Sequence, residues 1–328
     1  MSVVSAPGRP ARPTLKAVRR QWTEGNLVSL AVLVAMLVLY SFFASLFTSF
    51  TIQALCNDTA ALALAAIGET LVVLTGGFDV SVGAIIGLVN VILATQLTGS
   101  GGHDLLWVVL AILIASAAGL VNGILVAYVR LQSIIVTIAT LFILSGIALK
   151  ILDQPGGSVP SGYVSALTGV TVIPRALIII LGGAAAWLAL KRTRLGAAIY
   201  AIGGDRESAR MSGIPVARRL LATYALAGVF YGLAGVFYTA QTGSGDPQTA
   251  TSFLLAPFIA VVLGGTRFGG GEGSAIGSII GAFIVTMIVA VIFVLGVDTF
   301  WTGIVEGIVL AGAVLLNSSV RRWRPRRP

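Results

Sequence analysis

Ten apolar segments, most of them close to twenty residues long, divide this sequence of 328 residues. They lie at about 27–47, 54–75, 84–98, 105–128, 133–152, 174–190, 219–240, 254–265, 274–296 and 300–317. A helix needs about 20 mostly apolar residues to cross the hydrocarbon core of a bilayer. Charged residues make up only 10% of the chain, against roughly 25% in soluble domains. We therefore predict an all-α fold: a polytopic membrane helix bundle of about ten transmembrane segments.

Two of these segments can be interpreted in more than one way. The run 27–47 has the apolar character of a signal-peptide core, but it is long and lacks a clean small-x-small cleavage site. We therefore expect it to be an anchored first helix. The run 254–265 is too short for a full span. The stretch 254–273 either begins its crossing earlier or enters the membrane only partway.

The positive charges predict the orientation of the bundle. With the N-terminus in the cytosol, ten crossings leave the segments 1–26, 76–83, 129–132, 191–218, 266–273 and 318–328 inside. Together with Arg219, which directly follows the fourth of them, these segments hold 19 of the 21 lysines and arginines, as the positive-inside rule requires. Both termini are therefore expected in the cytosol, 1–26 as a basic disordered tail and 318–328 as a second basic tail. The net charge of +9 marks the orientation and does not indicate a nucleic-acid partner, which would need a basic patch on a polar surface.

The rare reactive residues argue against catalysis in this chain. It has one cysteine, Cys56, and one histidine, His103, so a cysteine metal cluster or a catalytic triad has no basis. None of the three lysines follows a glycine, so no phosphate-binding loop of the type G-x-x-x-x-G-K-[ST] is present. We expect neither an enzyme nor a metal site, and any ATP hydrolysis would belong to another chain.

Glycines mark helix breaks and close helix packing. Gly76 and Gly77 are expected to end one helix, and Asp79 or Ser81 to cap the next, near Gly83. Asp79 then has either a structural capping role or a direct role in a transport pathway. The stretch 72–77 is echoed at 261–266, where Gly264 and Gly265 stand, which indicates either duplicated halves or chance similarity. Pairs spaced four apart, such as Gly119/Gly123 and Gly228/Gly232, favour close helix contacts in lipid.

The inside segment 191–218 predicts a short, isolated helix. Asp205 suits the N-cap and Glu207 suits the positive helix start. Gly213 can end the helix, and Pro215 prevents its continuation. Such a helix between two membrane spans is either a docking element for a partner protein or an ordinary loop with a helical turn.

Three stretches resemble one family of membrane proteins. The stretch 207–215, Glu-Ser-Ala-Arg-Met-Ser-Gly-Ile-Pro, resembles the coupling loop of bacterial ABC importer permeases, in particular the ribose-type monosaccharide permeases of the branched-chain amino-acid/sugar permease superfamily. Residues 66–83 resemble that family's A-x-G-x-T-x-V-x-x-T-x-G-I-D-L-S-V-G, and 260–266 its A-V-V-L-G-G-T. The resemblance covers about 54–317 and makes 27–317 a permease domain.

This resemblance implies a set of partners. Two permease chains, identical or related, would form the pathway in the bacterial inner membrane, and a periplasmic binding protein would deliver the sugar. Separate ATPase subunits would hold ATP and magnesium, so no cofactor is expected in this chain. The ATPase contact would be the coupling stretch, with Gly203, Gly204, Asp205, Glu207, Ala209, Gly213 and Pro215.

Polar residues inside apolar segments are candidates for the substrate pathway. We single out Asp79, Ser81, Asn90 and Asn122, and note further Asn57, Asp58, Glu69 and Glu306. Glu306 and the stretch 253–258 depart from the ribose-type pattern, which leaves the sugar and the second permease chain open. The alternatives are a permease for branched-chain amino acids or another small solute, and an ion-coupled secondary transporter with Glu69 or Glu306 as coupling site.

Overall fold

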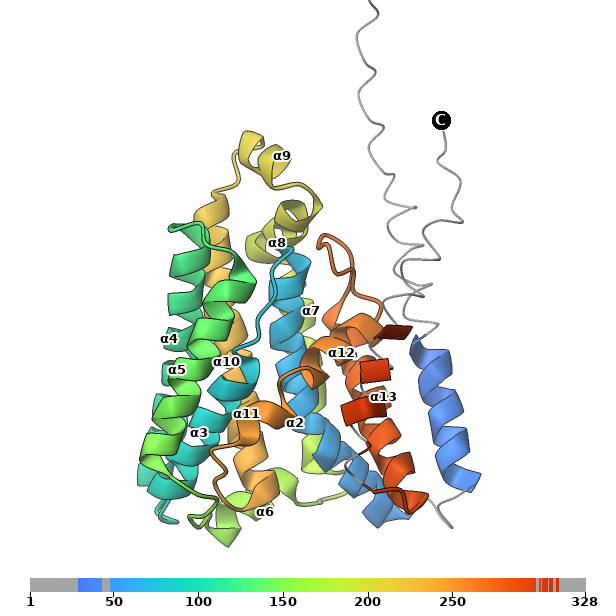
Figure 1. Cartoon of the computed structure of the whole chain (residues 1–328). Coiled ribbons are helices and arrows are strands. Elements are labelled where there is room, and N and C mark those ends of the chain that lie inside the picture. The colour runs from blue at the N-terminus through green and yellow to red at the C-terminus, as the bar shows by residue number, and fades with distance from the viewer. Residues whose placement is uncertain are drawn as a thin grey trace, which may run out of the picture.

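The computed structural model describes residues 29–42 and 48–298, together with 301, 303–305, 307, 308, 311 and 312. These residues form helices, turns and two isolated β-bridges, and no strand is formed within them. The all-α prediction is therefore confirmed (Figure 1). The two basic tails and Glu306 lie outside the described residues.

The long helices run along the bundle axis, and several short helices connect them at its two ends (Figure 1). They are an apolar helix at Ser29–Phe42, α2 (Ser49–Leu74), α3 (Val82–Gln96), α4 (Gly101–Ala127), α5 (Ser133–Ile151), α6 (Ser161–Thr168), α7 (Arg175–Lys191), α8 (Arg194–Gly204), α9 (Arg206–Met211), α10 (Val216–Thr242), α11 (Thr249–Ser252), α12 (Ala256–Leu263) and α13 (Ala275–Val294).

Five described helices are long and apolar enough to span a membrane, namely α2, α4, α5, α10 and α13. A sixth is added if α7 and α8, which are bent by 77° at a short break, count as one span. The polytopic bundle is thus confirmed with fewer full-length spans in the described residues than the expected ten. The difference has two causes: Ser29–Phe42, α3 and Thr249–Leu263 are shorter apolar helices, and the last predicted segment, 300–317, lies largely outside the described residues. With 15 residues, α3 reaches only about 22 Å at 1.5 Å per residue, and α12 has 8 residues.

A turn inserted into the bundle explains the short α3. The helix α2 climbs to the end of the molecule that carries α8 and α9. The chain then descends through residues 75–81, the α2–α3 turn, before α3 begins near mid-height (Figure 1). The other half of the crossing that contains α3 is therefore formed by the irregular backbone of the α2–α3 turn. Irregular backbone at this depth is tolerated only where protein satisfies its polar groups.

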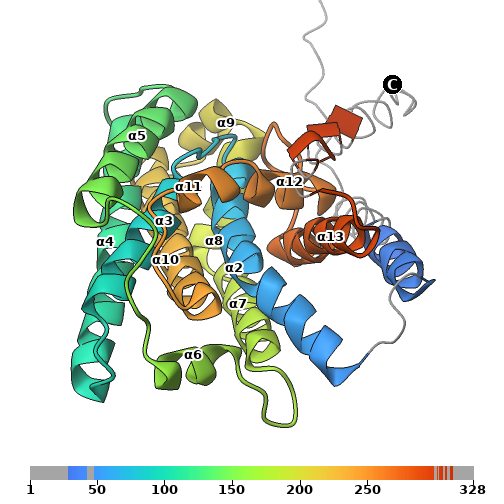
Figure 2. The same cartoon turned by 60° about the horizontal axis from the view of Figure 1, so that its bottom comes forward.

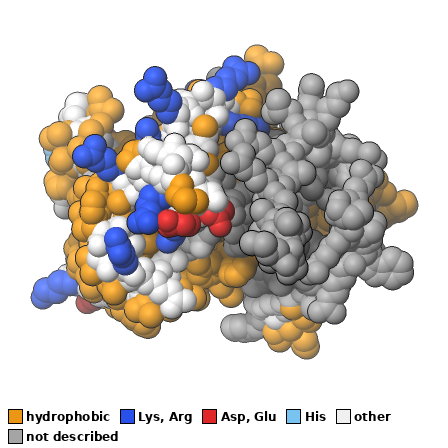
Figure 3. Space-filling view, turned by 90° about the horizontal axis from the view of Figure 1, so that it is seen from above, with side chains coloured by type: hydrophobic (Ala, Val, Ile, Leu, Met, Phe, Trp, Pro, Cys, Tyr) orange, Lys and Arg blue, Asp and Glu red, His pale blue; other side chains and the backbone are white. Residues whose placement is uncertain are grey.

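The end that carries α8 and α9, here called the coupling end, holds the predicted inside segments 129–132, 191–218 and 266–273 (Figure 1). Lys150 and Arg175 lie toward the opposite end, at the last turn of α5 and the first residue of α7. Seen from above, the described part of the coupling end shows many basic side chains and few acidic ones (Figure 3).

The core is built around α2, which is buried from Thr59 to Leu74, whereas α4 and α5 expose large apolar side chains at the periphery (Figure 2). The contact between α4 and α10 depends on glycine. A Cβ on Gly119 would overlap the backbone of Tyr224, and one on Gly228 would overlap that of Ala115. The predicted glycine pairs thus pack in a common helix interface, as close approach in lipid requires.

Replacing Gly228 by valine is expected to lower stability markedly, since the added side chain must push α10 away from α4. Overpacking of this kind costs about 1–3 kcal/mol, so the detergent-solubilised variant should aggregate at a lower temperature. The matched control is Gly146→Val, because a Cβ at Gly146 meets no atom within 4 Å. Equal melting behaviour of the two variants would contradict the packing described here.

Candidate functional site

Two buried carboxylates lie at the α2–α3 turn. Glu69 on α2 is 1% exposed and Asp79 in the turn is 2% exposed. Glu69 Oε1 accepts a hydrogen bond from the Asp79 backbone N–H at 3.3 Å, and Glu69 Oε2 accepts one from the Tyr231 hydroxyl on α10 at 3.0 Å. No basic side chain forms an ion pair with either carboxylate within the described chain. Buried carboxylates in a membrane bundle are functional candidates.

Asp79 and Ser81 form the start of α3. Ser81 is the N-cap residue, but its own side chain makes no capping bond. Instead Asp79 Oδ1 accepts hydrogen bonds from the Ser81 backbone N–H at 2.9 Å and from the Ser81 hydroxyl at 2.5 Å. Asp79 Oδ2 is buried without a hydrogen-bond partner. One carboxylate oxygen of Asp79 therefore stabilises the turn, and the other has no hydrogen-bond partner.

Asn122 extends this network to α4 and α5. Its amide Nδ2 donates to the Ser81 hydroxyl at 2.9 Å, and its Oδ1 accepts from the Thr140 hydroxyl at 2.5 Å. The structure thus brings together three of the four pathway candidates, Asp79, Ser81 and Asn122. Their hydrogen bonds connect α2, α3, α4, α5 and α10 into one buried polar chain.

Side chains from α5 and α10 complete the site, and no sequence motif pointed to them. Ser133 Oγ accepts from the Phe78 backbone N–H at 3.1 Å, and Thr137 Oγ1 from that of Val80 at 3.1 Å. Ser133 and Thr137 are spaced four apart and so share a helix face, which was the available signal. No sequence pattern indicates the hydrogen bond between Tyr231 and Glu69, because the two residues are far apart in the sequence.

Asn90 lies apart from this chain and fastens a loop nearer the opposite end. Its Nδ2 donates to Thr239 Oγ1 at 3.2 Å and to the Ser244 carbonyl at 2.9 Å, and its Oδ1 accepts from the Asp246 backbone N–H at 2.7 Å. Its polar atoms are therefore engaged in holding the 244–246 backbone against α3.

The glycines expected to break helices allow close approach of backbones. Gly76 and Gly265 both have positive φ, 77° and 78°. In each case the glycine N–H donates a hydrogen bond to the carbonyl of the residue three positions earlier. The N–H of the next residue donates to the carbonyl five positions before it, as in a Schellman C-cap. A Cβ on Gly83 would overlap the Ala250 carbonyl, one on Gly264 would overlap Gly277, and one on Gly77 would approach the Tyr224 hydroxyl. The sequence echo therefore corresponds to two local C-caps of the same kind, at the ends of α2 and α12.

A junction of glycines joins α8 to the core. The Gly271 N–H donates to the Leu74 carbonyl at the end of α2 at 2.9 Å. A Cβ on Gly203 would overlap that same carbonyl and the Gly271 nitrogen, and one on Gly271 would approach Gly204. We call Leu74, Gly203, Gly204, Gly270 and Gly271 the glycine junction. Because no side chain separates these backbones, a displacement of α8 must move α2 or the loop 264–273.

The predicted isolated helix is α9, which projects beyond the bundle (Figure 1). Asp205 is its N-cap and accepts from the Ser208 backbone N–H at 2.6 Å. Glu207 pairs with Arg210 at 2.9 Å, and Gly213 ends the turn with a φ of 82°. The helix runs over Arg206–Met211, slightly shorter than expected, because its last turn unwinds at Ser212. Only Ala209 is buried, in a small apolar cluster with Ile202 and Leu220. Pro215 precedes α10 as its N-cap residue.

The Asp205 cap gives α9 a defined pH dependence. Hydrogen bonds from Ser208 lower the pKa of the Asp205 carboxyl below its usual value. The cap is therefore fully formed above the ordinary aspartate pKa of about 4 and is lost as the pH falls through the lowered value. We expect amide-exchange protection of residues 206–213 to drop below about pH 4, and Asp205→Ala to remove that dependence. An unchanged pH profile in the variant would contradict the capping role.

Comparison with known proteins adds independent information. Residues 51–314 match the family described as the branched-chain amino acid transport system permease component. The ribose import permease protein of Escherichia coli strain K12 is 35% identical over 313 residues, covering 92% of this chain and 97% of that protein. The galactose/methyl galactoside import permease protein of the same strain is 30% identical, covering 90% and 94%. The fructose import permease protein of Bifidobacterium longum is 30% identical, covering 82% and 83%. No solved structure matches.

Proposed function

This chain belongs to the branched-chain amino acid transport system permease family, and on that premise we propose that it is the membrane subunit through which an ATP-driven importer moves a monosaccharide. The three relatives described above are named for ribose, galactose and fructose import. Together they favour a sugar over a branched-chain amino acid. The chain is a multi-pass membrane protein, and we place it in the bacterial inner membrane.

The projecting helix α9 is the observation that carries the ATP-driven part of the proposal. It is capped and largely exposed, and it contributes one buried side chain to the bundle. A membrane subunit that receives force from a separate ATPase needs an element of this kind at its cytosolic end. We therefore assign residues 203–215 to the contact with the ATPase, which would hold ATP and magnesium.

The glycine junction offers a route from α9 to the membrane interior. Movement of α9 passes to α8, and from α8 to the Leu74 carbonyl and the loop 264–273. Aromatic side chains continue the route to the α2–α3 turn. Phe78 of that turn packs edge-on against Phe258 with ring centroids 4.5 Å apart and against Phe268 of the loop at 6.3 Å. ATP hydrolysis outside the membrane would thereby change the position of the turn inside it.

The buried polar chain is better suited to fixing the position of the α2–α3 turn, as a clamp, than to binding a sugar. The donors and acceptors of Ser81 and Asn122 are directed at one another and at Thr140, and Asn90 is likewise engaged. A sugar needs open hydrogen-bond partners, and among Asp79, Ser81, Asn90 and Asn122 only Asp79 has a buried polar atom without a partner in the described structure, its Oδ2. We therefore propose positioning roles for these residues.

A second permease chain and a periplasmic binding protein complete the proposed importer. The sugar is best identified by a binding screen on the periplasmic binding protein of this importer, using ribose, galactose, fructose and leucine. We expect one monosaccharide to bind and leucine not to bind. Binding of leucine alone would shift the proposal to an amino-acid permease.

An ion-coupled transporter is the second candidate, because Glu69 and Asp79 form a buried carboxylate pair. Such carboxylates serve as proton or ion sites in secondary transporters. The two proposals separate on energetics. Uptake that stops when the proton gradient collapses while ATP is maintained would favour the second candidate.

A further inference from the structure

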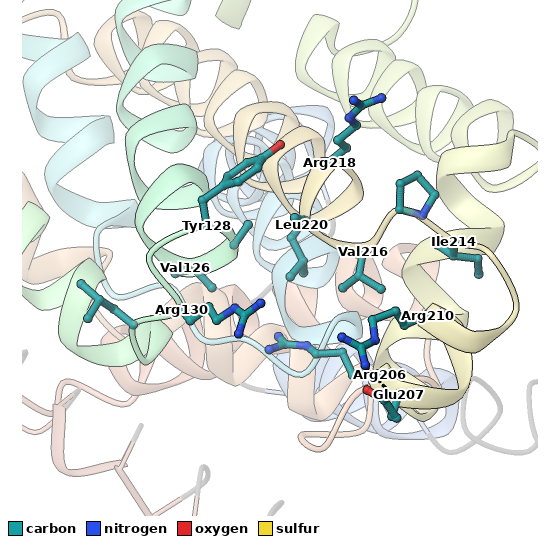
Figure 4. Close-up of a pocket in the computed structure, with 14 residues that line it drawn as sticks. Val126, Tyr128, Arg130, Arg206, Glu207, Arg210, Ile214, Val216, Arg218 and Leu220 are labelled. Atoms are coloured by element: carbon teal, nitrogen blue, oxygen red, sulfur yellow. Dashed lines mark hydrogen bonds and ion pairs between the residues drawn. The ribbon is translucent and has the colours of Figure 1, made fainter.

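A groove opens beside α9 at the coupling end (Figure 4). It has a volume of about 590 Å³ and is formed by three stretches: the end of α4 with the following corner, α9, and the start of α10. We call it the basic groove. Its lining includes Tyr128 and Arg130 from the α4–α5 corner, and Arg206, Glu207 and Arg210 from α9.

The charges of the groove are unbalanced. Four arginines line it, Arg130, Arg206, Arg210 and Arg218, against one acid, Glu207. That acid pairs with Arg210 at 2.9 Å, and no other described carboxylate forms an ion pair with the remaining three. Arg130 and Arg206 extend toward each other from opposite walls (Figure 4). Like charges that converge without a counter-ion favour an anionic occupant.

The backbone of the α4–α5 corner supports the same conclusion. Arg130 has a φ of 65° and is the one non-glycine residue with positive φ in the described chain. The corner is held in place by the N–H groups of Val129 and Leu131, which donate to carbonyls of α4. Residues kept in this conformation at an energetic cost concentrate at functional sites. A glycine or asparagine would fit the backbone more easily, so the guanidinium itself is a reason for arginine at this position.

The floor of the groove is apolar. Val126, Val216 and Leu220 line it, and Leu220 joins α9 to the bundle through Ala209 and Ile202. An occupant that fits must therefore combine negative charge with an apolar side chain. The wall formed by α9 stands farther out than any other described helix (Figure 1). Three of its five exposed side chains, Arg206, Glu207 and Arg210, are charged, and the other two are Ser208 and Met211. The groove thus opens to the aqueous side and not to the acyl chains of the bilayer.

We propose that the basic groove seats an acidic segment of the ATPase subunit, one that carries at least two carboxylates and an apolar side chain. The α4–α5 corner then acts as a second docking element beside α9. This inference rests on the proposed function and deepens it, because the groove is continuous with the ATPase contact assigned to α9. Arginine is suited to the role, since its planar guanidinium binds a carboxylate in bidentate fashion.

The test uses the full-length permease assembled with its ATPase and binding protein in nanodiscs. The variants are Arg130→Glu, Arg206→Glu and the double variant, with Arg219→Glu as matched control on α10 outside the groove lining. Arg130→Gly removes the charge while accepting the positive φ, so it guards against misfolding. We expect the ATPase to bind about tenfold more weakly to each single variant, Arg130→Gly included, and about a hundredfold more weakly to the double variant, on the scale of charge pairs at interfaces. Arg219→Glu should change affinity less than about twofold, as rim charges do.

Three outcomes would overturn the inference. In the first, the Arg130→Glu variant binds the ATPase normally while deletion of α9 abolishes binding. This result would refute the role of the basic groove and leave the proposed function intact. Equal losses in Arg219→Glu would show a general charge effect. A loss seen only in nanodiscs with phosphatidylglycerol, and absent in phosphatidylcholine, would assign the groove to an anionic lipid headgroup. If binding survives deletion of α9 as well, the proposed function itself fails.

Discussion

Deletion of residues 205–213 is expected to abolish association with the ATPase subunit and to reduce sugar uptake at least about a hundredfold, while the protein remains in the membrane. The loss should be this large because an interface loses most of its energy when its central element is removed. Abundance should change little, since α9 contributes only Ala209 to a small apolar cluster. The measurement is co-purification of the ATPase with the variant from detergent extracts.

A second variant separates the helix from its side chains. Alanine at Arg206, Glu207 and Arg210 keeps the Asp205 cap and the Gly213 turn, so α9 should persist. We expect it to bind the ATPase at intermediate strength. Undiminished co-purification with the deletion variant would contradict the role given to α9.

Replacing Asp79 by alanine is expected to remove most of the folded protein from the membrane. The change takes away the acceptor of both the Ser81 N–H and the Ser81 hydroxyl in the buried α2–α3 turn. Each buried polar group left unsatisfied costs about 1–3 kcal/mol. The total is therefore a large fraction of a typical stability of about 5–15 kcal/mol. Fluorescence-detection size exclusion of the solubilised variant measures the loss.

Asp79→Asn is the matched control, because the amide keeps an oxygen at the Oδ1 position. It should fold at more than about half the normal abundance and transport at a comparable rate per molecule, if the carboxylate acts as a clamp. Normal abundance combined with lost transport would show that the charge takes part in the pathway or in ion coupling. Normal abundance of Asp79→Ala would contradict the clamp altogether.

Local signals in the sequence identified the parts of the site that depend on local chemistry. The cap at Asp205 and the stop at Gly213 predicted α9, and Gly76–Gly77 predicted the break after α2. The predictions of these features are correct because neighbouring residues in the sequence determine them. The likeness between 72–77 and 261–266 likewise corresponds to two matching C-caps.

Features that depend on tertiary contacts could not be predicted in this way. Asn90 and Asn122 look alike as amides in apolar helices, yet only Asn122 joins the carboxylate network. Tyr231 and Thr137 are ordinary residues of apolar helices until the fold places them beside Glu69 and the α2–α3 turn. The half-length α3 was equally hidden, because an apolar run of this length does not reveal that the preceding turn enters the bundle.

Sugar uptake into proteoliposomes tests the central claim most directly. The chain is reconstituted with its ATPase and binding protein, ATP is enclosed on the ATPase side, and labelled monosaccharide is presented with the binding protein on the other. We predict uptake that requires hydrolysable ATP and all three proteins and that persists when a protonophore collapses the proton gradient. Uptake without the ATPase that stops on addition of the protonophore would contradict the account and assign the buried carboxylates to ion coupling.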